Sequence, residues 1–114
     1  MLTIEALNAY GANTGEGLNR CMNNETFYLR LVKMAVEDGN FAKLEDAVRR
    51  SNLKEAFEAA HALKGVLSNL ALTPILDPVL EITEQLRAGE ERDYTAAVSQ
   101  ILEKRELLRS LING

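Results

Sequence analysis

The sequence predicts an all-α protein, an antiparallel up-down four-helix bundle with additional short helices at its N-terminus. Apolar side chains recur at helical spacings, three or four residues apart, through most of the 114-residue chain. β-Branched and aromatic residues never alternate with polar residues over a useful length, as they would in half-buried strands. Several long segments are joined by short connections, which place consecutive helices antiparallel to one another.

The first half of the chain is predicted to form four helices, most of them preceded by a cap residue. A short helix over Leu2–Tyr10 ends near Gly11, because glycine adopts the left-handed conformation that terminates helices. Asparagine and threonine favour helix starts, because their side-chain oxygens accept hydrogen bonds from the free amides there. Asn13 or Thr14 is the predicted cap of a short second helix that reaches about Met22. Asn24 is the predicted cap of the third helix, which ends at Gly39, and Asn40 is the predicted cap of the fourth, Phe41–Arg50.

The second half is predicted to form three longer helices. Asn52 caps the first of them, and Glu55, at its third position, can close a capping box. Thr73-Pro74 starts the second helix, although Asp77-Pro78 would serve equally well as a cap and first position. The remaining boundaries are Gly89, which ends the second helix, and Asp93, which caps the last.

Four segments are long enough to form the bundle, and their apolar side chains define its core. We expect residues 24–38, 52–71, 74–88 and 93–112 to be the bundle helices, with Phe41–Arg50 and the N-terminal pieces covering its ends and one flank. The side chains expected inward are Phe27, Tyr28, Leu31, Met34 and Ala35; Phe41, Leu44 and Val48; Leu53, Ala56, Ala60, Leu63, Leu67 and Leu70; Ile75, Val79, Ile82 and Leu86; and Tyr94, Val98, Ile101, Leu108 and Leu111.

Length, composition and charge fit one domain over residues 1–114 and disfavour several kinds of site. Apolar residues make up 46% and charged residues 26% of the chain, as in ordinary globular proteins. The net charge of −4 and the lack of a Lys or Arg run argue against a surface for nucleic acid or anionic membranes. Cys21 is the only cysteine, which excludes an internal disulfide and a thiolate metal cluster. We expect a cytoplasmic location, because no segment approaches a membrane span of about 20 apolar residues and the first residues do not resemble a signal peptide. A monomer is also expected.

His61 is the only histidine, and it lies on a helix where a core residue would not lie. At about 100° per residue, it falls roughly 130° from the middle of the apolar stripe on its helix. Lys64 and Gly65, three and four residues later, are its nearest neighbours on the same side. Glycine inside a helix costs about 1 kcal/mol relative to alanine. We therefore interpret Gly65 as an opening that gives a partner access to a nucleophilic ring.

Each of these residues also has a simpler explanation. A single histidine on a helix is most often a surface residue, a lone lysine is a solvated charge, and a glycine can allow close helix packing. The spacing Glu58-x-x-His61 matches that of di-iron bundles, but those sites need two such motifs that point inward, so no metal is expected. The combination of histidine, lysine and glycine on one strip is more specific than any of the three alone.

The sequence around the histidine resembles the signature of histidine-containing phosphotransfer (HPt) domains. It reads His61-Ala62-Leu63-Lys64-Gly65 and continues with Ser68-Asn69-Leu70, whereas the family pattern is H-x-L-K-G, then small residues, then N-L-G. The chain departs from this pattern at Ala71, where glycine is usual, and at Leu67, where a smaller residue is common. The helical layout of nearly the whole chain is also similar to that family.

The resemblance implies a phosphorelay carrier without kinase or hydrolase machinery of its own. Neutral His61 would take a phosphoryl group, through Nε2, from a receiver-domain aspartate and pass it to a second receiver aspartate. Mg²⁺ would belong to the receiver, so no cofactor is expected, and the implied partners are response-regulator receiver domains and a hybrid histidine kinase. Lys64 would pair with phosphoryl oxygens, and Gly65 would let the partner close over the ring. The other assigned residues are Glu58, Ala62, Ser68 and Asn69 for the partner surface, and Gln85 and Arg87 as support for the phosphate.

Two other functions remain as alternatives. A degenerate relative would dock receiver or kinase domains as a helical adaptor without carrying phosphate, although the joint presence of His61, Lys64 and Gly65 argues against it. An unrelated enzyme is disfavoured by the single histidine and by the lack of a polar cluster in the predicted core. The chain also lacks the phosphate-binding loops G-x-x-x-x-G-K-[ST] and G-x-G-x-x-G.

Overall fold

Seven α-helices and no strand make up the chain in the computed structural model, which describes residues 1–114. The all-α prediction is therefore confirmed. In chain order the helices are α1 (Ile4–Tyr10), α2 (Thr14–Arg20), α3 (Glu25–Val36), α4 (Asn40–Arg49), α5 (Leu53–Asn69), α6 (Thr73–Arg87) and α7 (Thr95–Asn113). None of the seven combines the length and the apolar character that crossing a membrane requires.

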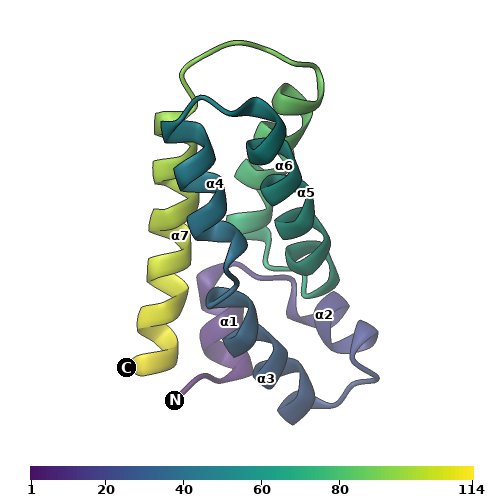
Figure 1. Cartoon of the computed structure of the whole chain (residues 1–114). Coiled ribbons are helices and arrows are strands. Elements are labelled where there is room, and N and C mark those ends of the chain that lie inside the picture. The colour runs from purple at the N-terminus through teal and green to yellow at the C-terminus, as the bar shows by residue number, and fades with distance from the viewer.

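The helices α4, α5, α6 and α7 form an antiparallel up-down four-helix bundle, which is the upper part of the molecule in Figure 1. α5 packs extensively against α4 on one side and α6 on the other, and α7 closes the ring between α6 and α4. The short helices α1 and α2 lie beyond one end of this bundle. The predicted fold class is therefore confirmed, and α5, which carries His61, lies between two neighbours that fix its orientation.

The membership of the bundle differs from the prediction in one helix. Residues 24–38, predicted as a bundle helix, contain α3, which lies below α4 and runs obliquely, with its C-terminal end in contact with α7 (Figure 1). Its predicted place in the bundle belongs to α4, which was expected to cover a flank. The physical reason is length: α7 has 19 residues and so spans about 28 Å, and two shorter helices in succession cover one side of it.

α3 buries a different set of side chains from the predicted one. Tyr28 is buried as expected, together with Val32 and Val36, but Phe27 and Met34 are 39% and 63% exposed. α3 packs against α7 and α2, and it carries more apolar side chains than these two neighbours cover. All other predicted core side chains are buried, except for four that are half-buried: Leu31, Val48, Leu53 and Leu111.

Asparagine caps confirm three of the predicted helix starts. The side-chain oxygens of Asn13, Asn24 and Asn52 each accept a hydrogen bond from the backbone amide three residues later, at 3.2, 3.0 and 3.1 Å respectively. α6 begins at Thr73, as predicted, and Gly89 follows its end with a left-handed φ of +71°. Local hydrogen bonding and backbone conformation therefore set these boundaries.

Asn40 and Gly39 do not have the roles predicted for them. Gly39 is the N-cap of α4 and has no side chain to contribute, whereas the carboxylate of Asp38 accepts a 2.8 Å hydrogen bond from the backbone amide of Asn40, which already lies inside the helix. α3 ends before Gly39, whose φ of −64° is right-handed, so this glycine terminates no helix. The backbone amide of Asn52 donates to the Ala47 carbonyl, and the carboxylate of Glu55 pairs with Arg50, so the predicted capping box does not form.

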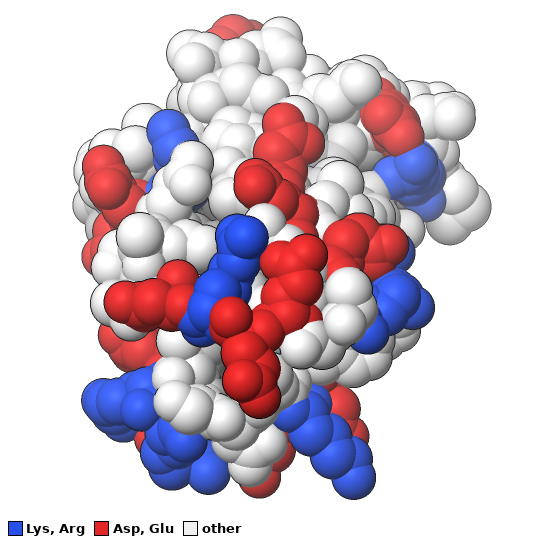
Figure 2. All heavy atoms as spheres, turned by 90° about the horizontal axis from the view of Figure 1, so that it is seen from above, with Lys and Arg blue, Asp and Glu red and all other residues white.

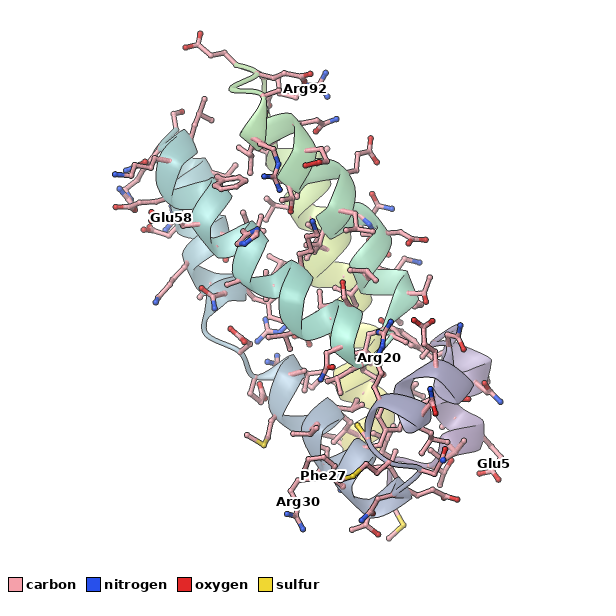
Figure 3. The ribbon with its side chains drawn as sticks, turned by 90° about the vertical axis from the view of Figure 1, so that its right-hand side faces the viewer. Glu5, Arg20, Phe27, Arg30, Glu58 and Arg92 are labelled. Atoms are coloured by element: carbon pink, nitrogen blue, oxygen red, sulfur yellow. The ribbon has the colours of Figure 1, made fainter.

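The N-terminal helices pack against the C-terminal end of α5. Three hydrogen bonds join the two parts: the Asn13 amide donates to the Ala71 carbonyl at 3.0 Å, the Tyr28 hydroxyl to the Leu70 carbonyl at 2.9 Å, and the Arg20 guanidinium to the Ser68 carbonyl. Figure 3 shows Arg20 reaching towards this end of α5. Carbonyl groups at a helix end have no partner within the helix, so these bonds satisfy them. The N-terminal segment thereby holds one end of the helix that carries His61.

Candidate functional site

His61 lies near the middle of α5 and is exposed, as its angular offset predicts. The opposite face of the helix is buried in the bundle and consists of Ala56, Ala59, Ala60, Leu63 and Leu67. Rotating α5 about its axis would expose these side chains, and each exposed Å² of apolar surface costs about 25 cal/mol. The packing of the buried face therefore keeps His61 on the outer surface.

Gly65 leaves the helix surface beside His61 open. The residue is exposed, and a Cβ atom added to it would meet no atom within 4 Å. The simpler explanation, that this glycine allows close helix packing, is therefore wrong within this chain. What remains is a bare stretch of helix surface one turn from the imidazole.

The side chains predicted for the partner surface surround His61 on the outside of α5. Glu58, Ala62 and Asn69 are exposed, and Figure 3 shows Glu58 pointing away from the bundle. Ser68 is half-buried, and its carbonyl oxygen is occupied by the N-terminal segment. The strip from residue 58 to residue 69 thus presents small and polar groups over about three helical turns.

Phe57 and His61 form an aromatic stack on the surface of α5. Their ring centroids lie 5.6 Å apart, and their planes differ by 23°. The guanidinium carbon of Arg87, on α6, lies over the Phe57 ring at 5.3 Å from its centroid, within the range of a cation–π interaction. The spacing of four residues indicates that the two rings are neighbours, but only the tertiary structure shows the link through Phe57 to α6.

Glu84, on α6, forms an ion pair with Arg87. Its carboxylate accepts a 2.8 Å hydrogen bond from Nε of Arg87. This hydrogen bond holds the pKa of Glu84 below its usual range, and the positive charge of Lys64 makes a smaller contribution in the same direction. Lys64 is half-buried, in agreement with its predicted place on the core side of His61. Sequence reasoning missed Glu84, although its position three residues before Arg87 was an available signal.

Gln85 does not lie where its predicted role requires. It lines a cavity between α6 and α7 together with Gln100, whereas Arg87 reaches α5 on the other side of α6. Side chains two residues apart on a helix point about 200° apart around its axis, so these two cannot both face His61. The structure therefore places Arg87 over the Phe57 ring on α5 and directs Gln85 towards α7.

An apolar groove lies between α3 and α5 and includes Gly65. It encloses about 590 Å³ and is lined by Leu31, Met34, Ala35, Asp38, Gly65, Val66, Asn69 and Leu70. Sequence reasoning missed this groove because it placed Met34 in the core. The packing of α3 on α7 leaves Met34 exposed, which a single-helix pattern does not reveal.

The site consists of an exposed imidazole stacked on Phe57, the half-buried Lys64 and a glycine gap. No group of three or more His, Cys, Asp or Glu side chains is arranged to hold a metal ion. A neutral imidazole is a nucleophile whose lone pair lies in the plane of the ring. Lys and Arg side chains pair well with phosphoryl oxygens. This set of groups can receive a phosphoryl group that a partner protein presents.

A comparison with models of protein families finds a match to most of the chain. The sequence model of the Hpt domain matches residues 35–113, which contain the last two residues of α3 and all of α4 to α7. No curated protein and no solved structure matches the chain. Hpt domains are phosphocarrier modules of two-component phosphorelays that interact with receiver domains and kinases. Because the match covers more than two thirds of the sequence, with the whole bundle and His61 inside it, the chain belongs to the Hpt domain family.

Proposed function

We propose that the protein is a phosphorelay carrier in which His61 accepts a phosphoryl group from one receiver-domain aspartate and passes it to another. One observation carries this proposal. The family transfers phosphate through a histidine, and His61 is the only histidine in the chain. It also lies inside the region that matches the family, exposed and beside an open glycine.

The transfer needs one nucleophilic atom from this chain. The lone pair of a neutral ring nitrogen, assigned here to Nε2, attacks the phosphorus atom of the aspartyl phosphate. An N–P bond forms while the bond from phosphorus to the aspartyl oxygen breaks, and the aspartate leaves as a carboxylate. The second receiver reverses this step, because its carboxylate attacks phosphorus and the imidazole leaves. Mg²⁺ and the catalytic aspartates come from the receiver, so the carrier mainly positions the reacting group.

Neighbours of His61 support this transfer in distinct ways. Lys64 offers positive charge to the phosphoryl oxygens from the α6 side of the site, and we assign Arg87, which lies over the Phe57 ring, only a supporting charge there. Gly65 leaves room for the receiver to close over the imidazole. The contact surface around them consists of Glu58, Ala62, Ser68 and Asn69.

The proposed partners are receiver domains and a hybrid histidine kinase. We propose no binding of nucleic acid or of a membrane. The net charge is −4, and Figure 2 shows acidic and basic side chains intermixed on the end of the bundle that it views. Nucleic acids and anionic membranes favour surfaces where Lys and Arg gather. We further propose that residues 1–114 form one monomeric domain that acts in the cytoplasm. A single core cluster of 26 buried residues, from Leu2 to Leu108, supports the single domain.

Phosphotransfer from a radiolabelled phospho-receiver tests the proposal. We expect wild-type protein to become labelled and the adduct to be labile in acid and stable in base, as a phosphohistidine is. His61→Gln keeps a polar side chain of similar reach but removes the nucleophilic ring. This variant should remain folded and bind the receiver, yet take up no label. A labelled His61→Gln protein would place the phosphate on another residue and overturn the assignment.

The second candidate is a helical adaptor that docks receiver or kinase domains without carrying phosphate. The open surface at Gly65 favours the carrier, because docking alone does not require helix backbone to be bare beside an imidazole. A wild-type protein that binds receivers but stays unlabelled, across the full set of receivers from its own cell, would establish the adaptor instead.

A further inference from the structure

We infer that Phe57 is a positioning residue for the His61 imidazole, and that Arg87 and Glu84 on α6 hold the Phe57 ring in place. The inference rests on the proposed function and deepens it, because it names what directs the nucleophilic nitrogen of an exposed ring. The evidence is a continuous set of contacts from α6 to the imidazole, which begins at a hydrogen-bonded ion pair and ends at an aromatic stack.

The first contact in this set is the stack of Phe57 on His61. The centroid distance of 5.6 Å and the angle of 23° between planes fit an offset aromatic pair, for which centroids lie about 4.5–7 Å apart. Phe57 precedes His61 by four residues, so both side chains rise from the same face of α5. A stack covers a face of the imidazole, whereas the lone pair of the neutral ring lies in its plane. Phe57 therefore restricts rotation of the ring without covering the reactive edge.

The second contact ties Phe57 to the neighbouring helix. Arg87 lies over the Phe57 ring at 5.3 Å, and its Nε atom donates a 2.8 Å hydrogen bond to Oε2 of Glu84. Phe57 is half-buried and packs against the core, whereas His61 is exposed. The aromatic ring thus connects an otherwise free imidazole to a part of the molecule that is fixed by packing. Glu84 accepts a hydrogen bond from the same guanidinium, and this exposed ion pair favours the direction in which the Arg87 side chain lies over the ring.

The consequence for transfer is geometric. Attack on phosphorus requires the nitrogen lone pair to point along the bond that breaks in the receiver. An exposed histidine can rotate about two side-chain bonds, so a receiver that docks correctly on α5 still meets several ring orientations. Holding the ring in one of them before the encounter removes part of the entropic barrier to the reaction. An aromatic pair of this kind corresponds to about a threefold to tenfold effect on rate.

Two measurements on the full chain separate this role from a purely structural one. Because His61 is the only histidine, its imidazole proton resonances are unique in the NMR spectrum. The ring current of Phe57 should displace them in wild type, and Phe57→Leu should return them towards the values of a free histidine. Phe57→Tyr keeps the ring and should preserve the displacement. Phe27→Leu makes the same chemical change on α3, away from His61, and serves as the matched control.

The second measurement is the phosphoryl transfer rate at increasing concentrations of phospho-receiver. Phe57→Leu should lower the maximal rate about threefold to tenfold and leave the half-saturating receiver concentration unchanged, and Phe57→Tyr should restore the rate. Thermal unfolding checks that each variant is folded, and Phe57→Met provides a second apolar replacement if the leucine variant is not. An unchanged maximal rate would show that Phe57 is a core residue only. A change confined to the half-saturating concentration would make it a docking contact.

The two proposals fail in different ways. The NMR comparison uses no phosphate, so imidazole resonances that do not respond to Phe57→Leu would overturn the positioning role by themselves. A wild-type protein that takes up no phosphate from any receiver would overturn the carrier function, whatever the NMR comparison shows.

Discussion

The hydroxyl group of Tyr28 on α3 donates a 2.9 Å hydrogen bond to the carbonyl oxygen of Leu70, the residue that caps the C-terminal end of α5. Tyr28 has no solvent exposure, and burial raises its pKa to about 12, so the phenol remains a neutral donor at physiological pH. Most of α3 lies before the residues that match the family. The helix that carries His61 is therefore anchored at one end by a part of the chain outside the matched region.

Tyr28→Phe should destabilise the fold without impairing transfer. The variant keeps the aromatic ring and leaves a buried carbonyl oxygen without its donor, which costs about 1–3 kcal/mol of unfolding free energy. His61 lies more than two turns from Leu70, so the rate of phosphoryl uptake should stay at the wild-type value. Urea unfolding and a transfer time course measure the two effects. Equal stabilities would show that water replaces the hydroxyl at the helix end.

The contribution of Tyr28 should also disappear at alkaline pH. Its pKa is about 12 in the folded protein and 10.0 in the absence of the fold. The folded state thus holds the phenol proton more tightly, and the stability from this difference is complete below about pH 10 and lost as the pH rises through about 12. Tyr28→Phe lacks this titration. The gap in unfolding free energy between wild type and variant should therefore shrink across this range, and a constant gap would contradict the burial effect.

Gly17→Ala should destabilise the junction between α2 and α3. A Cβ atom at Gly17 would lie 2.6 Å from atoms of the Tyr28 ring, which is fully buried and cannot move aside freely. Overpacking of this kind costs about 1–3 kcal/mol. Gly15→Ala on the same helix is the matched control, because its nearest neighbour would be the Asn13 side chain at 3.9 Å. Thermal unfolding should separate the two variants, and similar melting temperatures would mean that α2 shifts to accommodate the methyl group.

Gly65→Gln should block transfer and leave the fold intact or slightly more stable. No atom lies within 4 Å of the position of a Cβ, and replacing glycine in an exposed helix gains up to about 1 kcal/mol. The longer side chain should crowd the imidazole and prevent the receiver from closing over it. Gly65→Ala adds a single carbon and serves as the control that retains most of the rate. A Gly65→Gln protein that accepts phosphate normally would show that the bare helix surface has no role in access.

Lys64→Ala should have a milder effect than loss of the histidine. A charge contact near the surface is worth about 1 kcal/mol or less, which corresponds to about fivefold at most in rate. Lys104→Ala removes another half-buried lysine, on α7, and should leave the rate unchanged. A transfer time course with one receiver compares the variants. Equal rates for Lys64→Ala and wild type would show that the charge of Lys64 does not assist the phosphate.

Local signals in the sequence determined where the helices begin and which side of α5 faces outward. Asn13, Asn24 and Asn52 cap their helices because an asparagine side chain needs only the amides of the next turn. The exposure of His61 follows from the spacing of apolar residues on a single helix. These features depend on residues within one or two turns of each other, so they are readable before any packing is known.

Only the tertiary structure decided which helices pack together and what surrounds His61. The pattern of apolar residues on one helix does not show which neighbouring helix covers them. The sequence therefore predicts α3 in the bundle and Met34 in its core, whereas the structure places α3 outside the bundle and leaves Met34 exposed. Arg87 and Gln85 are close in sequence, yet only Arg87 reaches Phe57 on α5, because helix rotation directs the two side chains to different neighbours. The bond from Tyr28 to Leu70 likewise joins residues that are far apart in the chain. Such contacts depend on the relative placement of whole helices, which the burial of all their apolar faces decides together.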